Sequence, residues 1–384
     1  MKKRKVAIIY QYIPQYRRRF YELLREKLNS RGLELTVIYG QPDPDEAKKG
    51  DAAELQWGQV IRNQYFNIGK WRMCWQPALP LIQDADLVIV EMANKLLINY
   101  ILLMQNALGV KKVAFWGHGK NFQAKKEHRF SEWIKRILST KIHWWFAYNS
   151  LSAEILRDLG YPSTRITVVQ NAIDTSQLKN ELDRLSSEDI ERVRSEIGLS
   201  GKHIGLYVGA MYPDKRLKFL LDSLVYVKEQ IPDFEMIFVG SGSDAYLVRE
   251  MADMNSWIHY SGPKFDKDKV IYFALSNLFL MPGAIGLAIL DCFTLRVPIV
   301  TTKAQGHGPE IVYFKDGENG IMVDPPDVPP LYAQAVVGLF RNESARLNLV
   351  EGCRASSLKF SMDNMVENFA NGIDLALAKG RNVD

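Results

Sequence analysis

The segment from Leu278 to Glu310 constrains the fold most, because two short apolar runs flank a glycine-bearing turn and a helical pattern. Residues 278–281 and 297–300 are continuously apolar, which predicts two strands buried on both faces of a parallel sheet. The turn at 283–286 leads into a helix N-terminus, where free N–H groups and the helix dipole attract anions. This segment therefore has the properties of a phosphate-binding β-α-β unit.

The chain has 384 residues, enough for two ordinary domains. It contains no run of about 18 uncharged apolar residues, so we expect neither a membrane span nor a bacterial signal peptide. Its three cysteines are too few and too scattered for a disulfide framework or a zinc site. The sequence predicts a cytoplasmic protein without a metal centre or cofactor.

Charge is shared unequally between the two halves. Residues 1–180 contain 28 Lys and Arg against 16 Asp and Glu, whereas residues 181–384 contain 21 against 28. Such asymmetry predicts domains with different partners, the basic one facing an anionic ligand or surface.

Strands and helices alternate through both halves. In the first half we expect strands at 6–10, 33–39, 87–90, 112–115, from 146, and at 166–169, with loops and a short helix over 41–80. A linker helix at 186–196, with Ser187 as N-cap, precedes strands at 203–208, 236–239 and 258–261, and the chain ends in helices. The loop after the first strand lacks a glycine-rich turn, which argues against a nicotinamide or flavin enzyme.

His118 follows the strand at 112–115 between two glycines. Catalytic groups gather at such carboxyl ends of parallel strands, although a lone histidine can equally be a structural residue of the loop. We interpret His118 as a candidate catalytic residue.

Two adjacent cations, Lys215 and Arg216, open the helix at 217–230, where the helix dipole disfavours positive charge. A bound anion would explain them, and a solvated charge pair is the alternative. Gly209 and Gly242 follow two neighbouring strands, where small residues allow a ligand to approach the backbone.

Residues 130–145 have helical apolar spacing with Lys135 and Arg136 alongside, which is typical of a surface-lying amphipathic helix. A helix packed on the sheet is the alternative. Tyr16 and Arg17 lie in the basic loop after the first strand. They are further candidates for contact with an acceptor substrate or with a membrane surface.

These motifs resemble the GT-B glycosyltransferases of family four, the retaining group 1 enzymes of bacterial surface-polysaccharide biosynthesis. The resemblance rests on the turn at 282–287, the strand at 297–300, FWGHGKN around His118, QNAID at 170–174, HGPE at 307–310 and DGENG at 316–320. Two positions depart from the family pattern, because Gly283 stands where the family has Glu and Ala210 where it has Arg.

The resemblance implies an α/β protein of two Rossmann-like, doubly wound parallel-sheet domains facing across a cleft. Their expected bounds are 1–174 for the acceptor-side domain, 175–200 for the hinge and linker helix, 201–360 for the nucleotide-sugar domain and 361–384 for a helix crossing back.

The resemblance also implies a metal-independent, retaining transfer of a sugar from a nucleotide-diphosphate donor. It assigns donor contacts to Gly209, Gly242 and Glu310, and a ribose contact to Asp291. Lys215, Arg216 and the amides of Gly286 and Leu287 neutralise the diphosphate, and His118 lies beside the transferred sugar.

The implied acceptor is a glycan carried on polyprenyl diphosphate, as in O-antigen or capsule assembly, at the anionic inner face of the cytoplasmic membrane. A soluble acidic acceptor is the alternative, and no nucleic-acid partner is expected. Two rival functions remain open, a GT-B sugar-nucleotide epimerase and a catalytically decayed nucleotide-sugar-binding scaffold.

Overall fold

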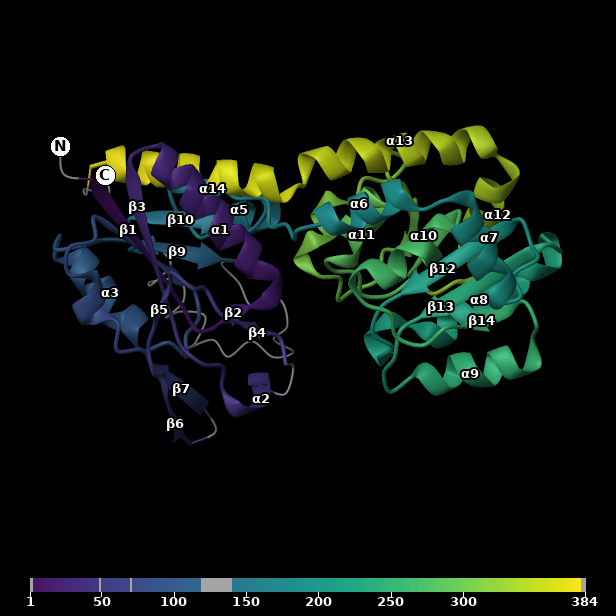
Figure 1. Cartoon of the computed structure of the whole chain (residues 1–384), viewed down its shortest axis with the longest axis horizontal. Helices are drawn as coiled ribbons and strands as arrows, with labels where there is room; N and C mark the ends of the chain where they lie inside the picture. The colour runs from purple at the N-terminus through teal and green to yellow at the C-terminus, as the bar shows by residue number, and fades with distance from the viewer. Residues whose placement is uncertain (1–2, 48–49, 70, 119–139, 381–384) are drawn as a thin grey trace. The chain divides into compact units, whose positions relative to one another are not determined.

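The computed structural model describes residues 3–47, 50–69, 71–118 and 140–380. The chain divides into two compact units, residues 1–174 with 362–384, and residues 175–361 (Figure 1). Each unit contains one parallel sheet flanked by helices. None of the helices in these ranges is both long enough and apolar enough to cross a bilayer.

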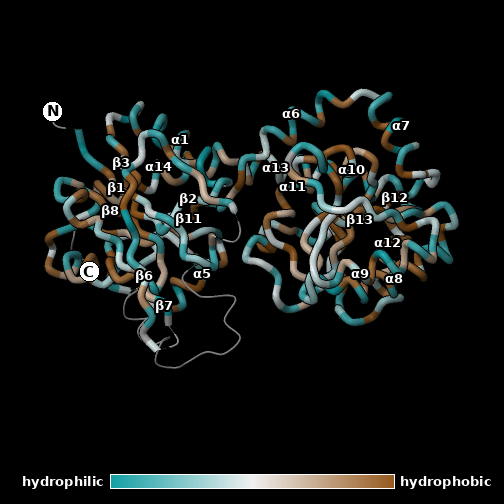
Figure 2. Tube along the Cα trace, turned by 60° about the horizontal axis from the view of Figure 1, so that its bottom comes forward, coloured by the Kyte–Doolittle hydropathy of each residue, from teal (hydrophilic) through white to brown (hydrophobic). Residues whose placement is uncertain are grey.

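The first unit is built on a seven-stranded parallel sheet of order β11-β10-β9-β8-β1-β3-β5. Its central strands are apolar and fully buried, and the tube along β1 and β3 is predominantly hydrophobic in Figure 2. The strands are β1 (Arg4–Tyr10), β3 (Leu33–Tyr39), β5 (Gln59–Val60), β8 (Leu87–Glu91), β9 (Lys112–Gly117), β10 (Trp144–Ala147) and β11 (Ile166–Val168).

Helices and short strands complete this unit. The helices are α1 (Gln15–Ser30), α2 (Pro44–Ala47), α3 (Ile98–Ala107), α5 (Ser150–Asp158) and α14 (Met362–Ala378), with 3-10 turns at Leu79–Ile82 and Ser163–Arg165. β2 (Ile13–Pro14) pairs with β4 (Ala52–Ala53), and β6 (Gln64–Ile68) pairs with β7 (Trp71–Trp75). The region 41–80 thus contains one antiparallel pair, β6 with β7, and the short strand β4, none of which the sequence predicted.

The predicted amphipathic helix at 130–145 is wrong at its C-terminal end. Trp144 and Trp145 belong to β10, and their exposed fractions are 2% and 0%. Aromatic residues favour strands, and here the sheet provides the apolar contacts that a membrane surface was expected to provide. Lys135 and Arg136 lie outside the described residues.

The second unit has a six-stranded parallel sheet of order β14-β13-β12-β15-β16-β17. Its strands are β12 (His203–Val208), β13 (Phe234–Val239), β14 (Ile258–Tyr260), β15 (Leu278–Leu280), β16 (Ile299–Thr302) and β17 (Gly320–Val323). The helices are α6 (Ser176–Arg184), α7 (Ser187–Glu196), α8 (Leu217–Gln230), α9 (Ala245–Met254), α10 (Val270–Ala274), α11 (Ala288–Thr294), α12 (Pro329–Arg341) and α13 (Glu343–Lys359). The 3-10 turns are η3 (Pro213–Lys215), η4 (Asp266–Lys269) and η5 (Pro309–Tyr313).

The N-cap of α7 is Ser186 rather than the predicted Ser187. The Ser186 hydroxyl accepts a hydrogen bond from the Asp189 N–H, while the Asp189 carboxylate accepts one from the Ser186 N–H. This reciprocal capping box satisfies two amide groups at once, which favours Ser186 over its neighbour.

The last helix, α14, packs against α1 and the β10 and β11 edge of the first sheet (Figure 1). Phe369 stacks on Phe146 with ring centroids 4.4 Å apart and also contacts Trp116. Gly372 makes the close approach possible, because a Cβ at this position would lie 2.6 Å from the Thr167 hydroxyl and 2.7 Å from the Phe146 ring.

We expect Gly372→Ala to lower the free energy of unfolding, because overpacking costs roughly 1–3 kcal/mol and outweighs the gain in helix propensity. The matched control is Gly338→Ala, since Gly338 lies exposed in α12 with open space around its Cβ position. That change should stabilise the protein by about 0.4–1 kcal/mol. Urea denaturation of both variants tests the packing of α14, and equal effects would contradict it.

Candidate functional site

Two loops of the second unit meet at Gly283. A Cβ on Gly283 would lie 2.6 Å from the Lys215 carbonyl oxygen, so only glycine fits. The Ala284 N–H donates a hydrogen bond of 2.8 Å to the Asp214 carbonyl. The turn after β15 is therefore packed directly on η3, and the acidic residue expected at 283 has no room.

Lys215 is brought to the start of α11 by this contact. Its Nζ donates a hydrogen bond to the Ala284 carbonyl, and burial lowers the pKa of its amine. Two residues further on, the Cβ position of Gly286 opens into space with no atom within 4 Å. A half-buried cation and an open glycine backbone at a helix start make this a candidate anion site.

His307 supports the same turn and was not singled out as a site residue from the sequence. The Ile285 N–H donates to His307 Nδ1 at 3.2 Å, and His307 Nε2 donates to the Thr302 carbonyl at 2.8 Å. These two bonds require the neutral Nε2-protonated tautomer, and burial lowers the pKa of the imidazole in agreement with this. A histidine directly before the Gly-Pro-Glu turn was the only available signal.

Glu310 begins η5 and is buried, with an exposed fraction of 6%. A Cβ on Gly308 would lie 3.0 Å from Glu310 Oε2 and 3.2 Å from Gly286 Cα. The Gly308 N–H also donates to the Ile285 carbonyl at 2.8 Å. Glu310 is therefore brought close to the Gly286 turn, and its predicted contact with the donor stays a prediction.

Arg216 is held away from Lys215 by other partners. It adopts a left-handed conformation (φ 57°), and its guanidinium donates to Thr302 Oγ1, to the Pro326 carbonyl and, at 2.5 Å, to Asp327. Its charge is thus matched by Asp327, and its predicted contact with a diphosphate would need these bonds to rearrange.

Asp291 lies in the first turn of α11, beyond Leu287, which is the N-cap of this helix. The Asp291 carboxylate is buried and accepts a hydrogen bond of 2.7 Å from Lys269 at the end of η4. If Asp291 contacts the ribose as predicted, the same carboxylate also binds Lys269, a residue that the sequence did not single out. Nothing near Lys269 in the sequence distinguishes it from a solvated lysine.

Glycines allow the two loops at the carboxyl ends of β12 and β13 to pack backbone against backbone. Gly209, Gly240 and Gly242 have φ angles of 151°, 147° and 152°, which L side chains rarely adopt. A Cβ on Gly242 would collide with the backbone of Met211, and the Met211 N–H donates to the Ser241 carbonyl at 2.8 Å. Gly209 and Gly242 thus shape the loop backbone next to the Lys215 turn.

In the first unit, His118 follows β9 and packs edge-on against Tyr148, with ring centroids 4.1 Å apart. Its Nδ1 lies 3.4 Å from Ser152 Oγ, whose proton is donated to Asn149 Oδ1. Nδ1 therefore carries the imidazole proton, and Nε2 is the accepting nitrogen. Burial and the Arg17 charge lower the pKa of His118 to about 4, which keeps it neutral at physiological pH.

Of the two residues predicted on the acceptor or membrane side, Arg17 lies in the interior of the first unit and Tyr16 lies on its surface. Arg17 has an exposed fraction of 1%, whereas its neighbour Tyr16 is 43% exposed. The helix turns the Arg17 side chain inward against Trp116 and Tyr148, so only Tyr16 remains on the surface.

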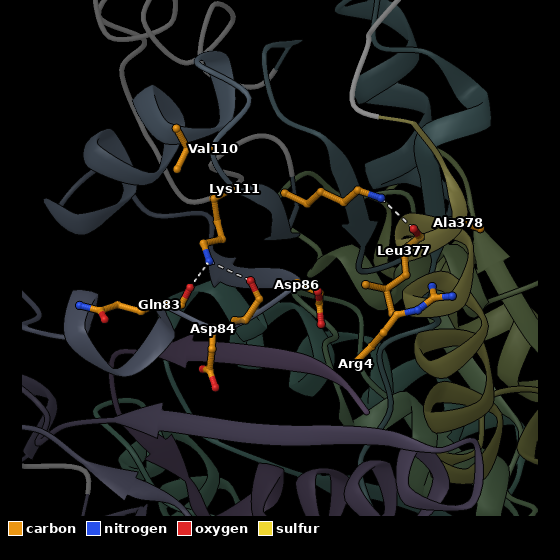
Figure 3. A pocket seen from close by; sticks show the side chains of 10 residues that line it. Arg4, Gln83, Asp84, Asp86, Val110, Lys111, Leu377 and Ala378 are labelled. Atoms are coloured by element: carbon orange, nitrogen blue, oxygen red, sulfur yellow. Dashed lines mark hydrogen bonds between the residues drawn. The ribbon is translucent and has the colours of Figure 1, made fainter. Parts of the chain in front are cut away.

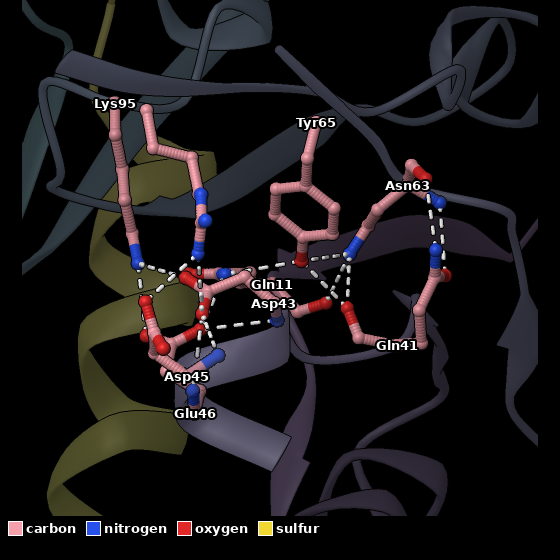
Figure 4. Close-up of polar contacts among 9 residues, drawn as sticks. Gln11, Gln41, Asp43, Asp45, Glu46, Asn63, Tyr65 and Lys95 are labelled. Atoms are coloured by element: carbon pink, nitrogen blue, oxygen red, sulfur yellow. Dashed lines mark hydrogen bonds and ion pairs between the residues drawn. The ribbon is translucent and has the colours of Figure 1, made fainter. Parts of the chain in front are cut away.

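Glu91 is a second residue that the sequence did not single out. It ends β8 and pairs with Trp116 in the sheet register, which places both side chains on one face. Burial raises the pKa of its carboxyl to about 7, with the Lys95 charge opposing the shift. Figure 4 shows Lys95 beside Glu46, to which it is bonded at 2.9 Å, and Glu46 accepts from Gln11 at 2.7 Å.

A cavity of about 490 Å³ lies at the opposite, amino end of the first sheet (Figure 3). It is lined by Arg4, Lys111 and Lys112, among others, but both lysines are engaged in capping backbone carbonyls. We therefore give it no role in the site. Across the described residues, no cluster of His, Cys, Asp and Glu is suited to holding a metal ion.

Two family models match the chain. One is described as glycosyl transferases group 1 and matches residues 202–342, and the other is described as glycosyltransferase family 4 and matches residues 18–177.

Curated relatives match over part of their length. Spore coat protein SA of Bacillus subtilis (strain 168) is 26% identical over 195 residues, which are 46% of this chain and 50% of that protein. Alpha-D-kanosaminyltransferase of Streptomyces kanamyceticus is 25% identical over 182 residues, 44% of this chain and 45% of that protein. The chain spans about half the length of the curated relatives it matches.

Solved structures match over nearly the whole chain. Anabaena Alr3699/HepE in complex with UDP has a TM-score of 0.69 at 15% identity, covering 96% of this chain and 99% of that one. WaaG, a glycosyltransferase involved in lipopolysaccharide biosynthesis, has a TM-score of 0.59 at 14% identity, covering 95% and 98%. The predicted fold class, GT-B with two parallel-sheet α/β domains, is confirmed by these similarities.

We expect Gly283→Ala to destabilise the second unit by roughly 1–3 kcal/mol, because the new methyl group meets the fixed backbone of residues 214–215. Gly286→Ala, three residues away in open space, is the matched control and should leave the free energy of unfolding within about 0.5–1 kcal/mol of wild type. Urea denaturation measures both. A Gly283→Ala variant as stable as the control would show that the two loops are not packed together.

Proposed function

We propose that this chain, whose two halves match the models described as glycosyl transferases group 1 and glycosyltransferase family 4, transfers a sugar from a nucleotide-diphosphate sugar to a glycan acceptor. The observation that carries the proposal is the packing of the Lys215 turn on the Gly283–Gly286 turn in the second unit. It places a half-buried ammonium group beside open helix-start backbone, a combination that suits the diphosphate of a donor. Structures of the Anabaena protein with UDP and UDP-glucose support UDP as the first nucleotide to try.

We further propose retention at the anomeric carbon, without a metal ion. The bond between the anomeric carbon and the diphosphate oxygen breaks, and a bond to the acceptor oxygen forms on the same face. The acceptor proton passes to the departing phosphate. Lys215 and the amides at Gly286 and Leu287 stabilise the charge that develops on that phosphate, which replaces the usual task of a divalent cation.

His118 is proposed to orient the transferred sugar. Its neutral imidazole has Nε2 as the accepting nitrogen, so it can accept a hydrogen bond from a sugar hydroxyl without placing another positive charge beside the reaction.

Incubation with a panel of nucleotide sugars tests the activity. A transferase should hydrolyse its own donor slowly in the absence of acceptor, releasing the nucleoside diphosphate. His118→Ala should retain wild-type affinity for UDP, since His118 lies in the first unit, but lose about 10²-fold in donor turnover because the sugar is no longer positioned. A new sugar stereoisomer would identify an epimerase, and binding without turnover would identify a scaffold.

Lys215→Ala tests the donor site. Loss of a charge-assisted hydrogen bond costs about 1.5–3 kcal/mol, so the affinity for UDP should fall roughly ten- to hundredfold in calorimetry. Lys218→Ala is the matched control, because Lys218 lies one turn away, exposed and paired with Asp222 at 2.9 Å. Equal affinities in the two variants would exclude Lys215 from the donor site.

The acceptor is proposed to be carried on polyprenyl diphosphate, in O-antigen or capsule assembly, with the protein at the inner face of the cytoplasmic membrane. The excess of positive charge in residues 1–180 supports this proposal, because each Lys or Arg near an anionic surface contributes on the order of 1 kcal/mol. Binding to anionic vesicles should weaken as salt rises, and Lys135→Glu with Arg136→Glu should reduce it. Equal flotation with anionic and neutral vesicles at low salt would leave a soluble acidic acceptor.

A further inference from the structure

Arg17 is a buried cation that has no acidic partner in the part of the chain that the structure describes. Its Nη2 donates to Asn171 Oδ1 and its Nη1 lies 3.5 Å from Met365 Sδ, both uncharged acceptors. Its Nε has no hydrogen-bond partner. Buried arginines are normally paired with carboxylates, because removing the charge from water is costly. No ion pair to Arg17 occurs among the described residues, so within them its guanidinium has only uncharged hydrogen-bond acceptors.

Aromatic rings surround the guanidinium and compensate its burial in part. Arg17 Cζ lies 5.0 Å from the Trp116 ring centroid, 5.7 Å from Tyr148 and 5.1 Å from Tyr16. Such contacts stabilise a cation electrostatically, but a ring face is a poor acceptor for the N–H group at Nε. The three rings therefore stabilise the guanidinium charge, but the N–H group at Nε still has no acceptor.

The backbone beside Arg17 is positive as well. Arg17 lies in the first turn of α1, a helix of 16 residues whose N-cap, Pro14, provides no side-chain cap. That first turn contains no acidic residue, although helix N-termini favour negative charge. A cation here opposes the helix dipole, so side chain and backbone together create a positive site that folding alone does not explain.

Neutral donors complete the surroundings. The hydroxyls of Tyr10 and Tyr148 lie 3.5 Å apart, and burial raises the pKa of Tyr148 to about 12, so it keeps its proton. Burial likewise raises the pKa of the Glu91 carboxyl to about 7, which reduces the negative charge nearby at neutral pH. The cluster thus offers hydrogen-bond donors and little negative charge.

We propose that Arg17, with the start of α1, binds the phosphate or diphosphate group of the acceptor substrate. The identity of the ligand as an acceptor substrate rests on the proposed function, whereas the existence of an anion site at Arg17 does not. Tyr16 lies over the guanidinium and is 43% exposed, so among the rings that contact Arg17 it marks the side nearest to solvent. A phosphate oxygen would then accept from Nε and neutralise the buried charge.

A purely structural role for Arg17 makes the opposite prediction about stability. Arg17 joins α1 to Asn171 and to Met365 of α14, and a structural clamp of this kind should be destabilising to remove. An unmatched charge retained for binding should instead be neutral or favourable to replace by an apolar side chain of similar shape. Arg17→Met therefore separates the two roles.

Calorimetric titration with inorganic pyrophosphate tests the proposal, on protein saturated with UDP so that the donor site is filled. Wild type should bind pyrophosphate, and Arg17→Met should bind it at least tenfold more weakly while melting at or above the wild-type temperature. Arg25→Met is the matched control, because Arg25 lies exposed on the same helix with its guanidinium 4.5 Å from the Trp57 ring, and it should bind as wild type does. If Arg17→Met fails to fold, Arg17→Lys should give an intermediate affinity, because it keeps the charge and loses the fork of donors.

Geranyl diphosphate in place of pyrophosphate identifies the source of the anion. Tighter binding of the prenyl compound supports a lipid-linked acceptor, and equal binding supports a water-soluble phosphorylated one. Failure of UDP to bind would count against the proposed function alone, since pyrophosphate titration without UDP still compares Arg17→Met with wild type. If Arg17→Met binds pyrophosphate as tightly as wild type does, the proposed anion site is overturned. A lower melting temperature of Arg17→Met together with that unchanged affinity would assign Arg17 a structural role instead.

Discussion

The close packing of Gly283 on the backbone of residues 214–215 is the contact on which the candidate donor site depends. It joins the loop after β12 to the loop after β15, and these two strands are neighbours in the sheet. Lys215 reaches the start of α11 only because no side chain separates the loops. The absence of an acidic residue at 283 is therefore a steric requirement of this arrangement.

Much of the fold could be predicted from apolar runs, because parallel strands buried on both faces lack polar alternation. The errors came where that signal fails. Trp144 and Trp145 were assigned to a helix since nearby lysines and arginines imitate an amphipathic pattern, yet both are buried in β10. The pairing of β6 with β7 was missed because neither QYFNI nor WRMCW is a continuous apolar run or alternates strictly between apolar and polar residues.

Site residues were predictable where a loop carries glycine beside a charge, as at Lys215 and Gly286. They were not predictable where the role depends on a distant partner. Lys269 and His307 gain their positions from contacts with residues 22 positions away, Asp291 and Ile285. The burial of Arg17 could not be predicted either, because residues 17–19 are three successive arginines. The helix turns only Arg17 into the aromatic core. Such selection follows from helical phase and from tertiary contacts together.

Because α14 belongs to the first unit while residues 175–361 form the second, the chain is not assembled in the order in which it is synthesised. When a ribosome has completed residue 174, the surface formed by Phe146 and Thr167 still lacks the helix that will cover it. A whole α/β unit must emerge before Phe369 and Gly372 become available. During that interval the first unit exposes the apolar surface of β10 and β11 that α14 will cover. The first unit is therefore synthesised first but completes its core last.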